Sequence, residues 1–315
     1  MISSAQLSQA QPPKVLPILS LNKFAFCLGI CREKLEKITE NIDSHYAPFP
    51  KKTGEKERII DNPTGLLKEA QSRIHNRILS SISFPDYVIG GVKGKKPYEH
   101  PQRHIHKPVV VTLDVKDCFP SITNKQVFDV WHKQLKCSSE VARLATKLTT
   151  RKGHLPLGAP TSNDLANLAL QPCLTNVMKV ANESGFSSDS VGQYIDDLAF
   201  SGLILPENFI NSIVKEFLKH GFRIRRDKIK VMRSNEPQVV TKKVVNRKVS
   251  IPLAKRNKIR AALYNLKNMD PKDPAYRKQY KSLRGRINNL KDFHPTLAKK
   301  AVIEFNKLSN PDKGT

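Results

Sequence analysis

Residues 193–200 read Gln193-Tyr194-Ile195-Asp196-Asp197-Leu198-Ala199-Phe200, which places two adjacent carboxylates inside an otherwise apolar, strand-like run. The wider segment 190–202 predicts a β-hairpin with the Asp pair at its turn. A third acidic residue, Asp114, lies near the end of 109–115, a continuous run typical of a strand covered on both faces. If these strands share one sheet, the three carboxylates lie close together. Unpaired, they would repel one another and be costly to desolvate.

Divalent cations would offset that cost. Mg²⁺ is a hard cation that binds carboxylate oxygens, and two such ions roughly 3.5–4 Å apart suit in-line attack on a phosphate. Mn²⁺ can substitute for it. The acidic residues therefore predict the two-metal site of a nucleotidyl transferase, while an Asp pair taken alone is equally compatible with an ordinary polar turn.

The overall charge predicts a polyanionic partner. The 315 residues include 54 Lys and Arg against 28 Asp and Glu, which gives a formal net charge of +26. Residues 241–315 hold 20 Lys and Arg but 5 Asp and Glu, so we expect this last quarter to contact nucleic-acid phosphates rather than only to solubilise the chain. The apolar fraction of 39% supports a packed core.

The five cysteines are scattered, which argues against a disulfide framework and favours a reducing compartment. We expect Cys27 and Cys31 to be core thiols on a helix face. The sequence shows neither a signal peptide nor a membrane span, so we expect a cytoplasmic protein without membrane association.

Periodicity predicts the remaining elements. Residues 1–14 are expected to be a loose tail, 23–42 one or two helices, 56–63 a strand ending in a turn, and 66–82 an amphipathic helix. A helix should start at Thr123 or Asn124, and another should follow the Pro- and Gly-containing start of 155–170. After Pro252 the chain is expected to be mostly helical and basic.

Three motifs follow one another in a characteristic order. They are Thr112-Leu113-Asp114-Val115-Lys116-Asp117-Cys118-Phe119-Pro120-Ser121-Ile122, then Leu155-Pro156-Leu157-Gly158-Ala159-Pro160-Thr161-Ser162-Asn163, then Tyr194-Ile195-Asp196-Asp197. In this order they resemble the catalytic motifs of the bacterial reverse transcriptases, among them the retron type and its relatives. The resemblance covers roughly residues 55–250, and the rest of the chain more loosely.

The resemblance implies an α+β, right-hand polymerase fold. Its palm would be an antiparallel sheet carrying the acidic triad, flanked by fingers and a basic helical thumb. The expected divisions are an N-terminal tail at 1–22, fingers with N-terminal helices at 23–108, the palm with a fingers insertion at 109–250, and the thumb at 251–315.

The family also implies roles for the catalytic residues. Asp114 and Asp196 would be the principal metal ligands, and Asp197 a weaker third. Lys228 resembles the lysine beside the departing pyrophosphate and could act as a general acid. As a basic residue, it could equally be a surface charge.

Further residues are implied to bind the incoming dNTP. Arg58 would clamp the triphosphate, because a guanidinium suits bidentate contact with phosphate. Asp117 and Cys118 would offer backbone N–H groups, and Phe119 would exclude a 2′-hydroxyl, unless its ring is only part of the core. From the second motif, Leu157 and Gly158 would line the site, with the glycine allowing close approach of the backbone.

Basic segments are expected to hold the nucleic acid. His100, His104, His106 and His154 lack cysteines at zinc-ligand spacing, so we expect contact with RNA phosphate or plain exposure. The thumb would follow a duplex. The nucleic-acid-binding residues expected are His104, Lys255, Arg256, Arg260, Lys281, Arg284 and Arg286.

The sequence also departs from the family at informative positions. Leu157 stands where the family usually has Gln, Asn163 where it has Pro, and Lys242 where it has Gly near the thumb; of an Asn-Ala-x-x-His motif only His104 remains. Losing the amide at position 157 could change nucleotide selection or template dependence. The changes at 104 and 242 touch segments linked in the family to a dedicated RNA.

The resemblance implies Mg²⁺-dependent copying of a cognate noncoding RNA into DNA from dNTPs. As in retrons, it implies a branched RNA-DNA product that serves antiphage defence with an effector protein encoded nearby. The alternatives are a defence-associated reverse transcriptase outside the retrons, using a different template or none, and a nucleic-acid-binding scaffold with a vestigial active site.

Overall fold

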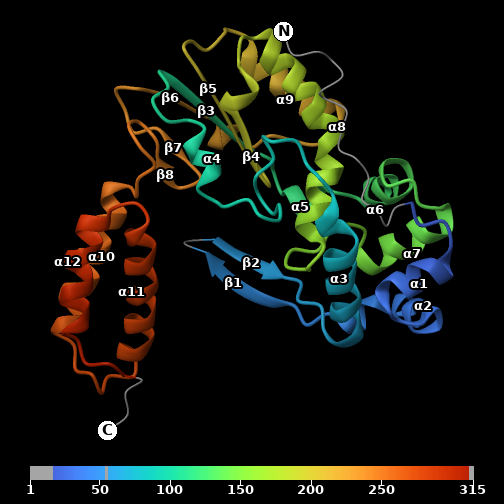
Figure 1. The fold of residues 1–315 in the computed structure, drawn as a ribbon, viewed down its shortest axis with the longest axis horizontal. Helices are drawn as coiled ribbons and strands as arrows, with labels where there is room; N and C mark the ends of the chain where they lie inside the picture. Colours follow the sequence, from blue (N-terminus) through green and yellow to red (C-terminus); the bar gives the residue numbers. More distant parts are fainter. Residues whose placement is uncertain (1–16, 54–55, 312–315) are drawn as a thin grey trace.

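The computed structural model describes residues 17–53 and 56–311. An antiparallel sheet with strand order β4-β5-β3-β6 lies at its centre. The strands are β3 (Val109–Asp114), β4 (Val191–Tyr194), β5 (Asp197–Gly202) and β6 (Lys230–Arg233). Figure 1 shows β3, β4 and β5 side by side, so the sheet unites segments that lie far apart in the sequence.

The valine run of β3 is covered on both faces, as its composition predicts. Val109 and Val111 belong to the main core, which includes buried residues of helices α8 (Ser162–Glu183) and α9 (Phe209–Lys219). Val110 points to the other face, where it packs in a smaller cluster with Ala199 and Met232. This alternation follows from the two-residue period of a strand.

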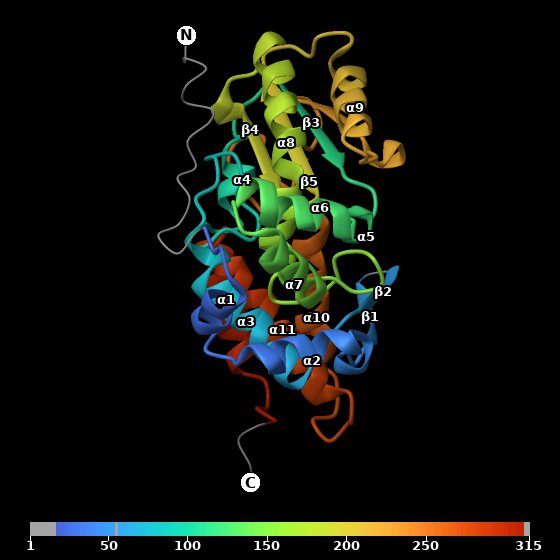
Figure 2. The same cartoon turned by 90° about the vertical axis from the view of Figure 1, so that its right-hand side faces the viewer.

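The main core continues into a helical part of the molecule (Figures 1 and 2). Its buried Trp131 packs edge-on against Phe24. The helix predicted to start at Thr123 or Asn124 is present, and Thr123 and Gln126 cap each other at its start in a capping box. The helices of this part and its neighbours are α1 (Leu21–Leu28), α2 (Arg32–Glu40), α3 (Gly65–Arg77), α4 (Glu99–Gln102), α5 (Cys118–Ser121), α6 (Asn124–Asp129) and α7 (Ser139–Thr149).

A hairpin of β1 (Phe49–Thr53) and β2 (Lys56–Ile60) projects from this helical part (Figures 1 and 2). Its Lys51 and Arg58 are directly paired across the strands, and both are exposed. A second small hairpin, β7 (Val239–Val240) with β8 (Lys243–Val244), precedes the C-terminal helices.

The C-terminal helices α10 (Leu253–Lys267), α11 (Tyr276–Lys291) and α12 (Pro295–Asn306) pack around a core of their own. Leu283 and Ile287 of α11 are fully buried in this cluster, and Phe305 of α12 stacks on Tyr280. Figure 1 shows the three helices as a distinct bundle beside the rest of the molecule. The bundle therefore has a hydrophobic core separate from the main one.

Most predicted elements are present, with some differences in extent. Residues 23–42 form two helices, because Gly29 takes a left-handed conformation (φ 62°) and ends α1. The expected tail at 1–14 lies outside the described residues. The prediction for Cys31 is wrong: it is exposed at the start of α2 rather than a core thiol, while Cys27 is partly buried. In the described parts of the chain, none of the helices is long and apolar enough to cross a bilayer.

Candidate active site

The hairpin of β4 and β5 turns through Ile195 and Asp196, with Tyr194 paired to Asp197. Ile195 has φ 58°, which is an unusual and strained conformation for a β-branched residue. Its buried side chain and a hydrogen bond from Gln193 Nε2 to its carbonyl oxygen (3.0 Å) hold it in place. The backbone that carries Asp196 and Asp197 is therefore held in one conformation.

Two adjacent glycines, Gly90 and Gly91, pack directly against this turn. A Cβ atom on Gly90 would lie 2.5 Å from the Ile195 nitrogen, and one on Gly91 would lie 3.0 Å from Ile195 Cδ1. Asn167 of α8 donates to the Gly90 carbonyl oxygen (2.8 Å). Only residues without a side chain fit this position, so the loop at 90–91 is part of the site. Residues 89–96 contain three glycines and three lysines, and nothing in that composition indicates that the segment supports the Asp pair.

The three carboxylates meet at one end of the sheet. Asp114 and Asp197 are direct partners in the β3–β5 register. Asp196 is tied to the same strand, because the Val115 N–H donates to its backbone carbonyl oxygen (2.9 Å). The structure therefore brings together Asp114, Asp196 and Asp197 from segments about eighty positions apart in the sequence.

Mutual repulsion and burial disturb the ionisation of these groups. Burial first, and then the neighbouring Asp196 and Asp114, raise the pKa of Asp197 to about 6. Burial, reinforced by Asp114, also raises the pKa of Asp196, while Arg58 and Lys228 oppose the rise. The ionised forms of Asp196 and Asp197 are consequently disfavoured at this end of the sheet.

Two cations bind the carboxylate of Asp114. Lys228 Nζ lies 2.9 Å from Oδ1 and 3.0 Å from Oδ2, and Arg225 Nε lies 3.3 Å from Oδ2. The Arg225 backbone N–H also donates to the Asp114 carbonyl oxygen (2.8 Å), and its guanidinium reaches Asp117 (3.1 Å). Arg225 is a site residue that sequence reasoning missed, since nothing in its local sequence separates it from its basic neighbours.

The donor set suits a hard divalent cation, although not in the present arrangement. Among residues 17–53 and 56–311, no three His, Cys, Asp or Glu side chains are grouped so as to hold a metal ion. Three neighbouring carboxylates, two of which have a raised pKa partly because of Asp114, are nevertheless the ligands that such a cation prefers. The Lys228 ammonium neutralises Asp114 here, so cation binding at Asp114 would require this lysine to move.

The residues expected at the dNTP lie around the triad. Asp117 has φ 46° and is exposed at the start of α5, next to the buried Cys118. Phe119 is half-buried against the main core. Arg58 is exposed on β2, near enough to lower the pKa of Asp196. These positions are compatible with the expected roles but do not test them.

The loop before α8 contacts the base of the β1–β2 hairpin. The Leu157 carbonyl oxygen accepts a hydrogen bond from the Asp61 N–H (2.8 Å), and the Leu157 side chain is half-buried. Gly158 has φ 116°, and a Cβ there would lie 2.6 Å from Ile60 Cγ2. In this structure the glycine therefore allows close packing against the hairpin.

The prediction that His104 contacts nucleic acid is wrong. Its side chain is fully buried, with Nδ1 2.8 Å from Ser201 Oγ of β5, and burial lowers its pKa well below the usual value. His100, which was expected to be exposed, is also buried and lies 2.6 Å from Thr241 Oγ1. Both rings pack behind the sheet, where Gly192 makes room for them.

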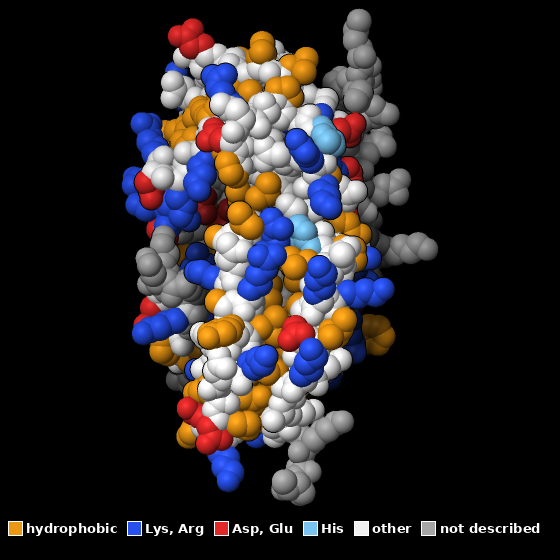
Figure 3. Space-filling model, turned by 90° about the vertical axis from the view of Figure 1, so that its left-hand side faces the viewer, with side chains coloured by type: hydrophobic (Ala, Val, Ile, Leu, Met, Phe, Trp, Pro, Cys, Tyr) orange, Lys and Arg blue, Asp and Glu red, His pale blue; other side chains and the backbone are white. Residues whose placement is uncertain are grey.

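The basic residues expected to hold nucleic acid lie on the C-terminal bundle. Figure 3 views the side of the molecule on which α10–α12 lie, and Lys and Arg side chains spread over it with few acidic ones between them. Arg256 is half-buried. The exposed residues of the expected set are Lys255 and Arg260 on α10 and Lys281, Arg284 and Arg286 on α11.

The raised pKa of Asp197 predicts a pH-dependent effect on stability. Because its folded pKa (about 6) exceeds the ordinary 3.8, the protonated group favours folding at low pH, and this contribution is lost as the pH rises through 6. Asp197→Asn should therefore raise the free energy of unfolding by about 1–3 kcal/mol at about pH 7.5 in EDTA, with the gain shrinking towards pH 5. Denaturant titrations at both pH values would measure it.

The matched control is Asp189→Asn, which removes an exposed carboxylate. We expect it to change stability by less than about 0.5 kcal/mol at either pH. A gain for Asp197→Asn that does not depend on pH would contradict the repulsion described above.

Comparisons with known proteins agree with this geometry. Residues 49–281 match the family described as reverse transcriptase (RNA-dependent DNA polymerase). The chain is 29% identical to the retron Se72 reverse transcriptase of Salmonella heidelberg over 59% of this chain and 48% of the relative. It is 28% identical to the retron Ec86 reverse transcriptase of Escherichia coli over 80% of this chain and 79% of the relative. It is 27% identical to the retron Ec48 reverse transcriptase of Escherichia coli over 87% of this chain and 72% of the relative. The match thus spans about half the length of the Se72 relative and more of the other two.

Proposed function

The chain belongs to the reverse transcriptases, the RNA-dependent DNA polymerases, and is of the retron type; on this premise we propose that it copies a cognate noncoding RNA into DNA. The observation that carries the proposal is the convergence of Asp114, Asp196 and Asp197 at one end of the sheet. In the family's right-hand arrangement, we assign the fingers to 23–108, the palm to 109–250 and the thumb to 251–315.

Divalent ions, which reverse transcriptases generally use, would bind at the carboxylates, and we propose Mg²⁺. Bound there, they would supply charge neutralisation for the attacking 3′-hydroxyl and the leaving pyrophosphate. The rigid Ile195 turn and the β3–β5 register support this assignment, because they fix the relative positions of the ligands.

The surrounding residues would position and protonate the reactants. Lys228, now on Asp114, would turn to the departing pyrophosphate and protonate it. Arg58 would hold the triphosphate from the projecting hairpin, and the backbone N–H groups of Asp117 and Cys118 would hold it from the palm. The Phe119 ring would lie against the sugar and exclude a 2′-hydroxyl.

We further propose that the product is a branched RNA-DNA molecule that acts in antiphage defence with an effector protein in the cytoplasm. The retron names of the relatives support this. Leu157, in place of the usual Gln, keeps a second function open: a defence reverse transcriptase that uses a different template or none.

The test is to purify the protein from its own host locus and to sequence the nucleic acid that accompanies it, with the Asp196→Asn protein as control. A defined RNA covalently joined to complementary DNA, absent from the control, is the expected result. DNA without a matching RNA would favour the second function. RNA alone in both samples would leave only a nucleic-acid-binding scaffold.

A further inference from the structure

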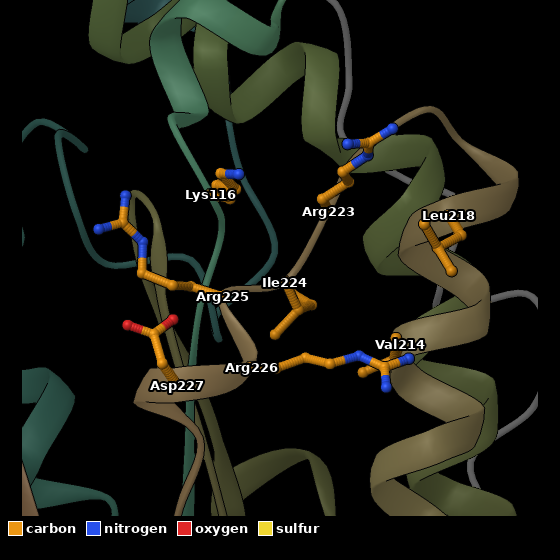
Figure 4. Close-up of a pocket in the computed structure, with 8 residues that line it drawn as sticks. All are labelled: Lys116, Val214, Leu218, Arg223, Ile224, Arg225, Arg226 and Asp227. Atoms are coloured by element: carbon orange, nitrogen blue, oxygen red, sulfur yellow. The ribbon is translucent and has the colours of Figure 1, made fainter.

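A separate basic pocket lies between α9 and the segment that follows it. Its volume is about 520 Å³. Figure 4 shows Lys116 and Arg223 on the segments that face α9, Val214 and Leu218 on α9 itself, and the Arg226 side chain extending towards Val214. The remaining lining residues are Ile224, Arg225 and Asp227.

The pocket carries uncompensated positive charge. Arg225 is already paired with Asp114 and Asp117, and Figure 4 shows its side chain running in the opposite direction to that of Arg226. No described carboxylate forms an ion pair with Lys116, Arg223 or Arg226, although the Asp227 carboxylate also lines the pocket. Three unpaired cations around one cavity repel one another, and an anion would relieve that repulsion.

The pocket lining also includes aliphatic side chains. Val214 and Ile224 are buried, and Leu218 is 50% exposed, which is high for a leucine. A volume of about 520 Å³ falls within the roughly 300–1,000 Å³ of small-molecule sites. Cations and aliphatic side chains lining the same pocket suit a ligand that carries both phosphate and a flat apolar ring.

The pocket is firmly attached to the catalytic strand. The Lys116 N–H donates to the Arg223 carbonyl oxygen (2.7 Å), and Val115 forms a β-bridge with Ile224. Backbone hydrogen bonds therefore fix the two segments that carry Lys116 and Arg223 relative to each other before any ligand binds, which lowers part of the entropic cost of binding.

We propose that this pocket binds a free nucleotide, separate from the dNTP site at the acidic triad. Lys116, Arg223 and Arg226 bind its phosphates, and its base packs on Leu218 and Val214. A free nucleotide fits better than a nucleic-acid strand because the cations and the aliphatic side chains come from three short segments around one depression of limited volume. The proposal does not depend on polymerase activity.

The test is equilibrium dialysis of the full-length protein, stripped of nucleic acid, against radiolabelled ATP in EDTA, so that no divalent ion supports binding at the triad. The double variant Arg223→Ala/Arg226→Ala should weaken ATP binding by about tenfold or more. Leu218→Asp, at an exposed position that tolerates a polar residue, should weaken it as well. The control Lys179→Ala/Lys215→Ala removes two exposed charges from α8 and α9 outside the pocket, and should change binding less than about twofold.

Competition distinguishes the sources of phosphate. Unlabelled ATP should displace the label at lower concentrations than pyrophosphate or a short single-stranded oligonucleotide. Equal displacement by pyrophosphate would mean a site for phosphate charge alone, and stronger displacement by the oligonucleotide a site for a strand. Either result would overturn the nucleotide assignment, as would ATP binding that the pocket variants leave unchanged. DNA synthesis on an RNA template in Mg²⁺ is assayed separately. A wrong nucleotide assignment would show in the ATP dialysis, and a wrong polymerase assignment would show in the synthesis assay.

Discussion

Replacing Asp196 with asparagine should lower the rate of DNA synthesis at least about a thousandfold, equivalent to about 4 kcal/mol of transition-state stabilisation. The amide has nearly the same shape as the carboxylate but is a much weaker ligand for a hard divalent cation. The fold should not change, since the Val115 hydrogen bond is made to the backbone of Asp196 and not to its side chain. Single-turnover primer extension on an RNA template would measure the loss.

Two controls separate catalysis from structure. Asp189→Asn removes an exposed carboxylate away from the triad and should leave extension unchanged. RNA binding by Asp196→Asn, measured by filter retention, should match that of the unaltered protein, because the expected RNA contacts lie on α10 and α11. If extension persisted within about tenfold, the triad would not be the catalytic centre and the scaffold interpretation would stand.

Local sequence patterns were enough to predict the elements that carry the triad. The valine run of β3 and the alternation around Asp196 and Asp197 are properties of a few consecutive residues, and the structure confirms both strands. That the two segments share one sheet was implied by the order of the motifs and by the family that this order resembles. The register that places Asp114 opposite Asp197 then arises from the pairing itself.

The features that the sequence did not indicate depend on contacts between distant segments. His104 lies in a basic stretch, yet it is buried because it packs against β4 and β5. Its ring contacts Ser201 of β5, and Gly192 of β4 has no side chain to obstruct it. Gly90 gives no local sign that it supports the Ile195 turn a hundred residues later. The pairing of Arg225 with Asp114 likewise becomes visible only when the chain is folded. Periodicity and composition describe neighbours in sequence, and these residues are neighbours only in space.

Replacing Lys228 with alanine should lower kcat by about a hundredfold or more, the range typical of a lost general acid. Its ammonium contacts both oxygens of Asp114, so it is the basic side chain most closely placed at the triad to move onto a leaving pyrophosphate. Steady-state extension at saturating dNTP would measure the change. Lys230→Ala, which removes an exposed charge two residues further on, should have little effect.

The arginine variant separates charge from proton transfer at this position. Lys228→Arg keeps a positive charge beside Asp114, but a guanidinium does not release its proton in the working pH range. If Lys228 donates a proton, Lys228→Arg should stay nearly as slow as Lys228→Ala, and both should lose the alkaline limb of the pH–rate profile. If Lys228→Arg recovered most of the rate with an unchanged profile, the lysine would act through its charge alone. If Lys228→Ala stayed within about threefold of the unaltered protein, its contact with Asp114 would have no part in catalysis.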